Sequence, residues 1–256
     1  LKLHPGCEPQ ITSDTDTIMT NSVIIEQKAL DIILNTYEPL FHESLGKITD
    51  FEHTIKVKED VLPIKHKLRS VPLSIRTELT KQIEKLLEED IIEPINSSLW
   101  LSPIVVKRKR NKEIRMCIDL RSLNQAIWVD SHPLPRIDDL ITSLHGAAVF
   151  SKLDMRSAYH QVVLSRETRH LTAFVTPDGV FQYCRMPFGL ASAASVFQRI
   201  MEEILIGLQG VVVYQDDVLI FGENQDQHND RLAKILEAML KRGLRLRRDK
   251  CIFGVH

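Results

Sequence analysis

Apolar residues recur at helical spacing in four segments of the chain, and each segment is expected to form a helix. The four segments are residues 27–37, 75–87, 192–206 and 226–241. The second has the clearest amphipathic pattern, and its apolar face consists of Leu79, Ile83, Leu86 and Leu87. Ser74 is placed to cap this helix near Ile75, and Gly243 is placed to end the last one.

Short apolar runs bounded by turn residues predict strands. These runs are residues 55–57, 103–107, 114–118, 149–153, 169–176, 180–185, 211–214 and 218–221. A basic turn that holds Asn111 separates the second run from the third, which is a β-hairpin pattern. Pro177-Asp178-Gly179 predicts a further turn. The mixed order of helices and strands, without an internal repeat, favours an α+β fold with a mainly antiparallel sheet.

The composition is ordinary for a globular protein. Of the 256 residues, 43% are hydrophobic and 26% are charged. No apolar run reaches the roughly 18 residues that a membrane span needs. The chain begins Leu1-Lys2-Leu3, without an initiator Met or a signal-peptide pattern, which indicates a piece of a longer polyprotein or a trimmed chain. The four cysteines are scattered and predict neither a zinc site nor a disulfide framework, so a reducing compartment is the simplest interpretation.

Positive charge gathers in two clusters, although the formal net charge is -1. One cluster lies at residues 107–112 and the other at residues 241–250. Local basic patches of this kind can bind phosphate backbones even when the total charge is near zero. A solvated surface explains either cluster alone equally well.

The run VVVYQDDVLIF at residues 211–221 places two adjacent carboxylates, Asp216 and Asp217, in the tight connection between two apolar strands. Two like charges this close repel each other, and desolvation makes it costlier to ionise both. A bound divalent cation removes that conflict, and hard oxygen ligands are those that Mg²⁺ prefers. An ordinary Asp-Asp hairpin turn is the alternative, and for this feature alone it is the more common one.

A third carboxylate changes that balance. Asp154 ends the strand-like run at residues 149–153, and Tyr159 follows five residues later. If this strand pairs with the hairpin of Asp216, three carboxylates converge at one end of a sheet. Such a cluster can hold two metal ions about 4 Å apart, one activating an attacking hydroxyl and one stabilising a leaving phosphate.

The order of motifs resembles that of Ty3/Gypsy-type reverse transcriptases. LDMRSAYHQV at residues 153–162 is similar to the first catalytic motif, and YQDD at residues 214–217 is similar to the Tyr-x-Asp-Asp signature. The matching segments around them are residues 101–106 and 115–124 (fingers), 132–136 (bridge), 181–193 (nucleotide pocket), and 243–246 and 250–253 (after the palm). The likeness runs in order from about residue 63 to residue 253.

The resemblance implies a right-hand polymerase palm, in which helices back an antiparallel sheet, together with a fingers subdomain. Residues 61–256 would form this reverse transcriptase domain, and residues 1–60 the linker or extension between protease and polymerase. The family's primer-gripping hairpin, thumb, connection and ribonuclease H follow later in the polyprotein. The thumb is therefore expected to be absent from these 256 residues.

The resemblance also assigns the catalytic chemistry. Asp154, Asp216 and Asp217 would bind two divalent ions, Mg²⁺ or Mn²⁺. The backbone of Met155 and its neighbours would hold the incoming triphosphate. Tyr159 would be a steric gate whose ring fills the space of a ribose 2′-OH, although a core aromatic is the alternative.

Further residues would contact substrate. Arg115 would reach the triphosphate, helped by Lys107 or Lys109, because a guanidinium suits phosphate oxygens. Phe188 and Gly189 would line the nucleotide pocket, with core packing an equal alternative for Phe188. Gln215 is expected to lie beside the primer end, at a position where relatives more often carry a hydrophobic residue. Arg121 and Asn124 are expected to support the fingers, and Asp119 to pair with Arg121 or another basic residue. His160 is expected to be structural.

The function that the resemblance implies is RNA- and DNA-directed DNA synthesis from dNTPs on a template with a primer. A decayed or co-opted element that binds nucleic acid or protein without catalysis is the alternative. The missing thumb favours weak activity for this stretch alone, whereas the intact carboxylates favour the enzyme. An RNA-templated RNA polymerase is disfavoured by Tyr159, since that enzyme must admit the 2′-OH. The protein is expected to be intracellular, in cytoplasmic particles, and a nuclear phase is left open. No membrane partner is expected, and the oligomeric state is left open.

Overall fold

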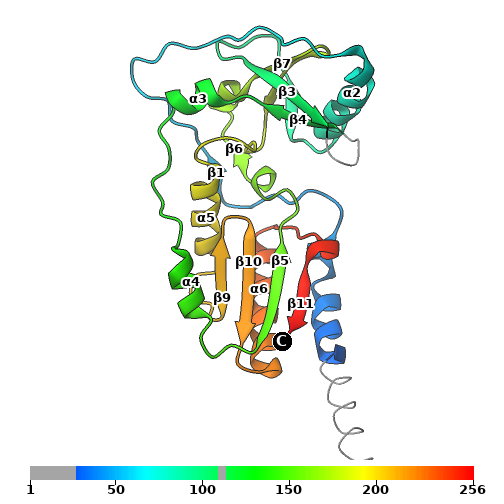
Figure 1. Cartoon of the computed structure of the whole chain (residues 1–256), viewed down its shortest axis with the longest axis vertical. Coiled ribbons are helices and arrows are strands. Elements are labelled where there is room, and N and C mark those ends of the chain that lie inside the picture. Colours follow the sequence, from blue (N-terminus) through cyan, green and yellow to red (C-terminus); the bar gives the residue numbers. More distant parts are fainter. Residues whose placement is uncertain (1–26, 109–113) are drawn as a thin grey trace, which may run out of the picture.

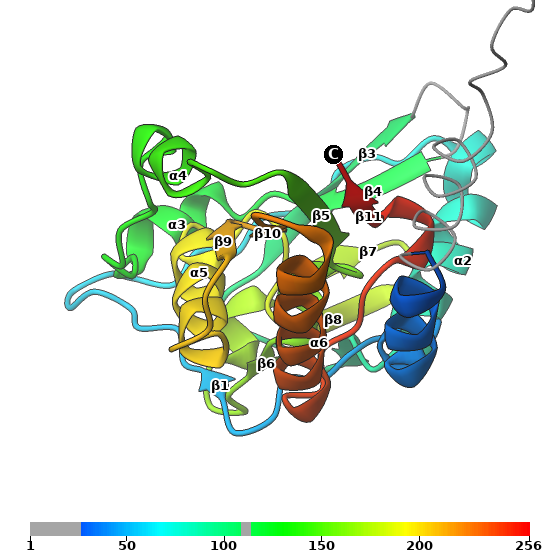
Figure 2. The ribbon, with the colours of Figure 1, turned by 90° about the horizontal axis from the view of Figure 1, so that it is seen from below.

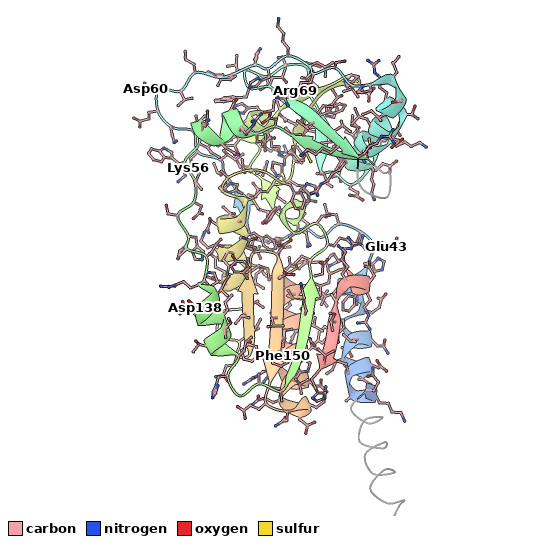
Figure 3. The ribbon with its side chains drawn as sticks, in the orientation of Figure 1. Glu43, Lys56, Asp60, Arg69, Asp138 and Phe150 are labelled. Carbon is pink, nitrogen blue, oxygen red and sulfur yellow. The ribbon has the colours of Figure 1, made fainter. Side chains whose placement is uncertain are left out.

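The computed structural model describes residues 27–108 and 114–256 (Figure 1). Residues 1–26 of the predicted linker, Lys109 and Asn111 lie outside the described residues. The molecule is elongated, with a four-stranded sheet at one end and a five-stranded sheet at the other. Figure 3 places Phe150 in the first of these parts and Arg69 in the second. We name the two parts the palm and the fingers.

The palm sheet is antiparallel throughout, with the strand order β11-β5-β10-β9. Its strands are β5 (Val149–Asp154), β9 (Val211–Tyr214), β10 (Asp217–Gly222) and β11 (Ile252–Val255). Helices α5 (Ala193–Ile204) and α6 (Gln225–Lys241) cover one face of this sheet (Figure 2). Alternate residues of β10 are buried because that face packs against the helices, and the other face carries Asp217.

Helix α6 has the predicted apolar face and the predicted end. Its buried apolar residues are Leu232, Ile235, Leu236 and Met239. The side chain of Asn224 caps the helix by accepting a hydrogen bond from the backbone N–H of Gln227. Gly243 ends it with a φ of +74°, and its N–H donates to the carbonyl oxygen of Leu240.

The fingers sheet has the order β2-β8-β7-β3-β4. Its strands are β2 (Ile92–Pro94), β3 (Ser102–Arg108), β4 (Ile114–Ile118), β7 (Phe174–Thr176) and β8 (Gly179–Tyr183). The predicted hairpins β3–β4 and β7–β8 both form, and a parallel contact between β3 and β7 joins them. Helix α2 (Leu73–Glu88) packs beside this sheet, and helix α3 (Arg121–Ala126) follows β4.

Three local predictions are wrong. Ser74 does not cap α2, because the helix already begins at Leu73, directly after Pro72, whose side chain makes no cap. Residues 55–57 form no strand; only Val57 makes an isolated bridge, to Ile127, because the segment crosses between the two parts of the molecule without a continuous partner. The predicted strand over 169–176 begins only at Phe174, because a 3-10 turn (η3, Arg169–Thr172) precedes it.

The remaining elements flank the palm or lie between the two parts (Figure 1). They are the helical residues 27–36, η1 (Glu38–Phe41), β1 (Glu52–His53), α4 (Ile137–Ser143), η2 (Ala158–Gln161), β6 (Val163–Leu164) and η4 (Arg248–Lys250). Strands β1 and β6 pair in parallel. The backbone N–H of Lys47 donates to the carbonyl oxygen of Gly243 and that of Ile48 donates to that of Gln161, so this stretch packs against the end of α6 and against η2. The division at residue 60 stays a prediction.

The predicted α+β architecture with mainly antiparallel sheets is confirmed. No helix in the described part of the chain is both long and apolar enough to cross a bilayer.

Candidate functional site

The three carboxylates predicted to act together come from neighbouring positions at one end of the palm sheet. Asp154 is the last residue of β5 and Asp217 is the first residue of β10, and the antiparallel register pairs them directly. Residues opposed in this way have Cα atoms about 4.5–5.5 Å apart. Asp216 immediately precedes Asp217 in the turn between β9 and β10. The sheet therefore brings together residues that are distant in sequence.

A lysine shares this end of the sheet. The ammonium Nζ of Lys152 lies 2.9 Å from Oδ1 of Asp217. The pKa of Lys152 is raised by this hydrogen bond first, and the charges of Asp217, Asp154 and Asp216 all act in the same direction. Lys152 stands two residues before Asp154, on the same face of β5. One cation thus lies in the field of all three carboxylates.

The donor set suits a divalent cation in its chemistry. Asp154, Asp216 and Asp217 supply the hard carboxylate oxygens that Mg²⁺ and Mn²⁺ bind. In the ranges 27–108 and 114–256, no three His, Cys, Asp or Glu side chains are grouped closely enough to hold a metal ion. The Asp217 carboxylate instead pairs with Lys152, which shows that this position accommodates positive charge.

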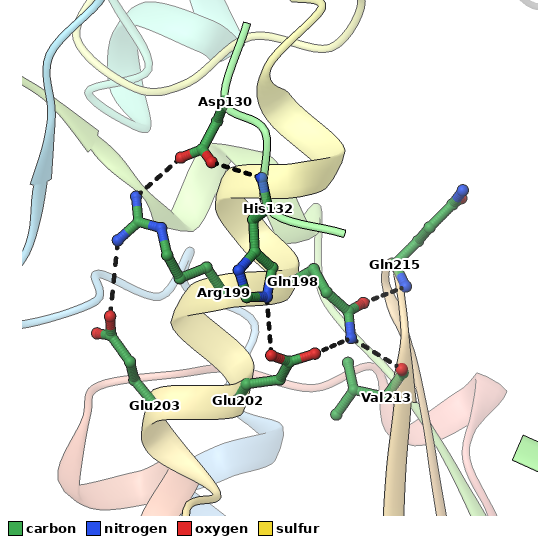
Figure 4. Close-up of polar contacts among 8 residues, drawn as sticks. All are labelled: Asp130, His132, Gln198, Arg199, Glu202, Glu203, Val213 and Gln215. Atoms are coloured by element: carbon green, nitrogen blue, oxygen red, sulfur yellow. Dashed lines mark hydrogen bonds and ion pairs between the residues drawn. The ribbon is translucent and has the colours of Figure 1, made fainter. Parts of the chain in front are cut away.

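Helix α5 holds the turn that carries Asp216 through hydrogen bonds. Gln215 has a φ of +57°, a left-handed conformation that is uncommon for a residue other than glycine. Its backbone N–H donates to Oε1 of Gln198 at 3.0 Å (Figure 4). Nε2 of Gln198, which is 1% exposed, donates to the carbonyl oxygen of Val213 at 3.0 Å. Sequence reasoning missed Gln198, and the available signal was a polar residue on the buried face of α5.

Tyr159 lies between the core and the carboxylates. Ser157 turns the chain after Asp154 with a φ of +49°, and Tyr159 follows in η2. The tyrosine ring lies with its centroid 5.1 Å from that of Phe188 and 5.7 Å from that of Phe197. Burial raises the pKa of the Tyr159 hydroxyl, and the charge of Asp216 raises it further. The ring therefore packs on the core while its hydroxyl lies in the field of the site.

Phe188 and Gly189 form an open edge next to Tyr159. Phe188 is 39% exposed, so its ring lies at the surface, where it packs against the rings of Tyr159 and His160. Gly189 has a φ of +87°, and a Cβ added there would meet nothing within 4 Å. Asn124 of α3 donates to the Gly189 carbonyl oxygen at 2.8 Å and accepts from the Ala191 N–H at 2.9 Å. Asn124 thus holds the loop before α5, and its predicted support of the fingers stays a prediction.

His160 and Met155 lie inside the fold. Burial lowers the pKa of His160 to about 4, and Arg185 adds to the effect. The His160 ring packs edge-on against Phe188, with centroids 4.9 Å apart. Met155 is 5% exposed and bridges to Leu246, so only its backbone can serve a ligand. The structural interpretation of His160 agrees with this environment.

The basic residues of the fingers lie on the β3–β4 hairpin. Lys107 and Arg115 are cross-strand partners, and both are exposed. Gln82 of α2 holds the backbone on either side of Arg115: it donates to the Ile114 carbonyl oxygen at 2.6 Å and accepts from the Met116 N–H at 3.1 Å. Gln82 is a second residue that sequence reasoning missed.

The predicted ion pair of Asp119 is confirmed and has a second partner. Arg121 and Arg69 each place a guanidinium nitrogen 2.7 Å from Oδ2 of Asp119. These bonds, that of Arg121 above all, hold the pKa of the Asp119 carboxyl well below its usual range. Arg121 itself is largely exposed, with 82% of its side-chain surface accessible.

Comparisons with known proteins agree on one family. Residues 106–255 match the family described as reverse transcriptase (RNA-dependent DNA polymerase). An uncharacterized protein of Caenorhabditis elegans is 34% identical over 99% of this chain, which is 20% of the relative. The retrovirus-related Pol polyproteins from the Drosophila melanogaster transposons opus and gypsy are 32% and 30% identical, over 89% and 98% of this chain and 23% and 25% of their own lengths.

The fold also matches a solved structure. The foamy viral protease-reverse transcriptase in complex with an RNA/DNA hybrid gives a TM-score of 0.82 at 19% identity, over 97% of this chain and 35% of that chain. The fold is therefore that of a polymerase palm with fingers. Because the family match covers more than half of the chain, this chain belongs to the reverse transcriptase family. Its similarity to Pol polyproteins such as that of gypsy confirms the resemblance to Ty3/Gypsy-type elements. The chain spans a fifth to a quarter of the relatives named here.

Proposed function

We propose that this chain carries the catalytic centre of an RNA- and DNA-directed DNA polymerase, which extends a primer with dNTPs. The observation that carries the proposal is the register of Asp154 opposite Asp217, with Asp216 adjacent, at one end of a palm sheet in a reverse transcriptase. Asp154, Asp216 and Asp217 would hold two Mg²⁺ or Mn²⁺ ions. When bound, such ions activate an attacking hydroxyl and neutralise the charge on the reacting phosphate.

The residues of the chain itself bind and orient the nucleotide. Arg115 and Lys107 present two exposed positive charges side by side on one hairpin, and a guanidinium binds phosphate oxygens through two parallel donors. Lys109, two residues after Lys107 in the sequence, would add a further positive charge. The backbone at Met155 would receive the triphosphate, and the open edge at Phe188 and Gly189 would receive the base and sugar.

Tyr159 would select the sugar. Phe197, which is fully buried, supports one side of the ring, so the ring cannot retreat into the core. A ribose 2′-OH would overlap with a ring fixed in this way. Selection of dNTPs favours a DNA polymerase over an RNA-templated RNA polymerase. Gln215, in the strained turn before Asp216, would lie beside the primer end.

Template and primer are the partners that this function requires. The foamy viral neighbours are complexes with an RNA/DNA hybrid and with double-stranded DNA. The basic hairpin in the fingers is suited to the phosphate backbone, because Lys and Arg contacts supply most non-specific affinity. The alternative, a co-opted element that binds without catalysis, predicts the same binding but no incorporation.

Template-directed incorporation of one labelled nucleotide tests the proposal. A chain extended through the downstream thumb is supplied with a primer on an RNA template and, in parallel, on a DNA template. We expect incorporation of the complementary dNTP on both templates, and loss of incorporation when a chelator removes the divalent cation. Binding of both duplexes without any incorporation at saturating Mg²⁺ would instead support the co-opted element.

A further inference from the structure

A continuous series of hydrogen bonds joins the turn before Asp216 to the segment that leads from the fingers to the palm (Figure 4). Gln215 donates its N–H to Oε1 of Gln198 at 3.0 Å, and Nε2 of Gln198 donates to Oε1 of Glu202 at 2.8 Å. The other carboxylate oxygen of Glu202 lies 2.8 Å from Nε2 of His132. We call residues 127–136, between α3 and α4, the connector.

The carboxylate of Glu202 and the carbonyl oxygen of Val213 together determine which way the Gln198 amide points. A carboxylate only accepts hydrogen bonds, and so does the Val213 carbonyl oxygen, so both require the NH₂ group of Gln198. The amide oxygen is then left to accept the N–H of Gln215. In the reversed amide, the NH₂ group would face the N–H of Gln215, and the amide oxygen would face the Glu202 carboxylate and the Val213 carbonyl oxygen. Because Gln198 is 1% exposed, water cannot compensate for that arrangement.

The turn depends on this support because its backbone is strained. Gln215 holds a φ of +57° directly before the two adjacent carboxylates. A residue in this region keeps its conformation only when its surroundings fix it. The bond from Gln215 to Gln198 is the contact that fixes it from α5.

The connector is attached to two successive turns of α5. Oδ2 of Asp130 lies 3.1 Å from Nη2 of Arg199, and Oδ1 of Asp130 accepts the backbone N–H of His132 at 2.9 Å. His132 then reaches Glu202, three residues after Arg199. Asp130 therefore orients His132, and His132 orients Glu202.

We propose that Glu202 and His132 are positioning residues which, through Gln198, couple the docking of the connector to the placement of Asp216 and Asp217. The inference rests on the proposed polymerase function and adds a route by which the fingers act on the catalytic turn. Neither residue touches substrate in this account. Their effect reaches the carboxylates through one buried amide.

Hydrogen exchange of the Gln215 backbone amide tests whether Glu202 holds the turn, and it does not require enzymatic activity. In Glu202→Ala, the amide of Gln198 keeps the Val213 carbonyl oxygen but loses its other acceptor, so Gln215 should exchange about tenfold faster than in the unaltered protein. Glu202→Gln keeps an oxygen that can accept from Gln198 and should exchange at the original rate. Glu203→Ala is the matched control, because Glu203 stands next in the same helix and its ion pair is with Arg199. Equal exchange of Gln215 in Glu202→Ala and Glu203→Ala would overturn the inference.

Single-nucleotide kinetics in the thumb-containing chain test the catalytic half. Glu202→Ala and His132→Ala should each lower kcat about tenfold, the scale of a small misplacement of reacting groups, with the dNTP KM and the template–primer Kd within about twofold of the original. The double variant should be no worse than Glu202→Ala, since the two residues act in one series. An unchanged kcat, or additive losses, would refute the coupling. If the unaltered chain incorporates nothing, the proposed function fails, while the exchange result still decides whether Glu202 holds the turn.

Discussion

Lys152 and Asp217 face each other diagonally across the β5–β10 ladder, with Nζ 2.9 Å from Oδ1. The ladder pairs Asp217 with Asp154 and Lys152 with Leu219, so the lysine lies one step from the carboxylates on the same face. Its charge reduces the mutual repulsion of Asp154, Asp216 and Asp217. A divalent cation at the same carboxylates would have to compete with this ammonium.

Lys152→Met should therefore strengthen binding of a divalent cation. The Lys152–Asp217 pair is partly exposed, at 46% and 56%, so its contribution is discounted for screening by solvent. The Kd for Mn²⁺ should fall by about two- to fivefold, which corresponds to ~0.5–1 kcal/mol. Titration of Mn²⁺ followed by electron paramagnetic resonance measures this affinity directly. Lys152→Arg keeps the charge and should leave the affinity unchanged; an equal affinity in all three proteins would contradict the competition.

Replacing Tyr159 by Ala or Val should open the sugar pocket. Incorporation of rNTPs should rise relative to that of dNTPs. The loss of discrimination should correspond to about 1–3 kcal/mol, the range that apolar pockets achieve. Phe174→Leu is the control, because Phe174 is fully buried and its aromatic neighbours are Phe181 and Tyr183. It should lower the melting temperature without changing the ratio of rNTP to dNTP incorporation. If the folded Tyr159 variants keep the original ratio, Tyr159 is a core tyrosine and the assignment as a gate is lost.

Acid should destabilise the fold through His53, which is buried, and His160, which is half-buried. The pKa of both His53 and His160 falls from 6.5 to about 4 on folding, chiefly because burial disfavours the charged ring. Between these values the unfolded chain binds protons that the folded chain does not, so stability falls as the pH falls from 6.5 to 4. Each histidine contributes up to ~1.4 kcal/mol per pH unit in that window.

Urea denaturation at several pH values measures this slope. His160→Phe keeps a ring beside Phe188 but cannot titrate, so it should flatten the slope by the share of one histidine. His42→Gln, at an exposed position, should leave the slope as it was. A slope that is equal in all three proteins would show that His160 is not the responsible group.

Gly243→Ala should destabilise the palm more than an alanine at a comparable glycine. Gly243 has a φ of +74°, and a Cβ added there would lie 2.3 Å from the carbonyl oxygen of Lys47. Gly207 has a φ of +79° but meets nothing within 4 Å, so Gly207→Ala carries only the cost of a left-handed conformation, about 1 kcal/mol. Gly243→Ala should cost at least ~2 kcal/mol in the free energy of unfolding. Equal losses at the two positions would mean that the close contact with Lys47 is relieved without cost.

Local pattern predicted the parts of the fold that repeat a simple rule. The helices α5 and α6 and the strands β5, β9 and β10 follow from apolar spacing, and the Asp154–Asp217 pairing follows once β5 and β10 are neighbours. The parallel contact of β3 with β7 could not be read in this way, because it joins residues about 70 positions apart without a local signal. The strand predicted at residues 55–57 was wrong for the same reason, because a strand needs a pairing partner and the local sequence does not identify one.

The site residues that belong to a sequence motif could be predicted, whereas those that reach the site only through tertiary packing could not. The carboxylates and Tyr159 stand in recognisable runs. Gln198 and Glu202 gain their importance only because α5 passes beneath the turn at Gln215. Lys152 could have been suspected from its place two residues before Asp154, which puts both side chains on one face of β5.

Asp216→Asn tests the central claim most directly, in a chain extended through the thumb. The substitution preserves shape and removes the charge that a divalent cation would bind. Primer extension and template–primer binding are measured on the same preparation, with Asp226→Asn, in the first turn of α6, as the matched control. We predict that extension is abolished while duplex affinity stays within about twofold, because Lys and Arg contacts carry the affinity. Retained extension, or an equal loss of extension and binding, would contradict the assignment of these carboxylates as the catalytic centre.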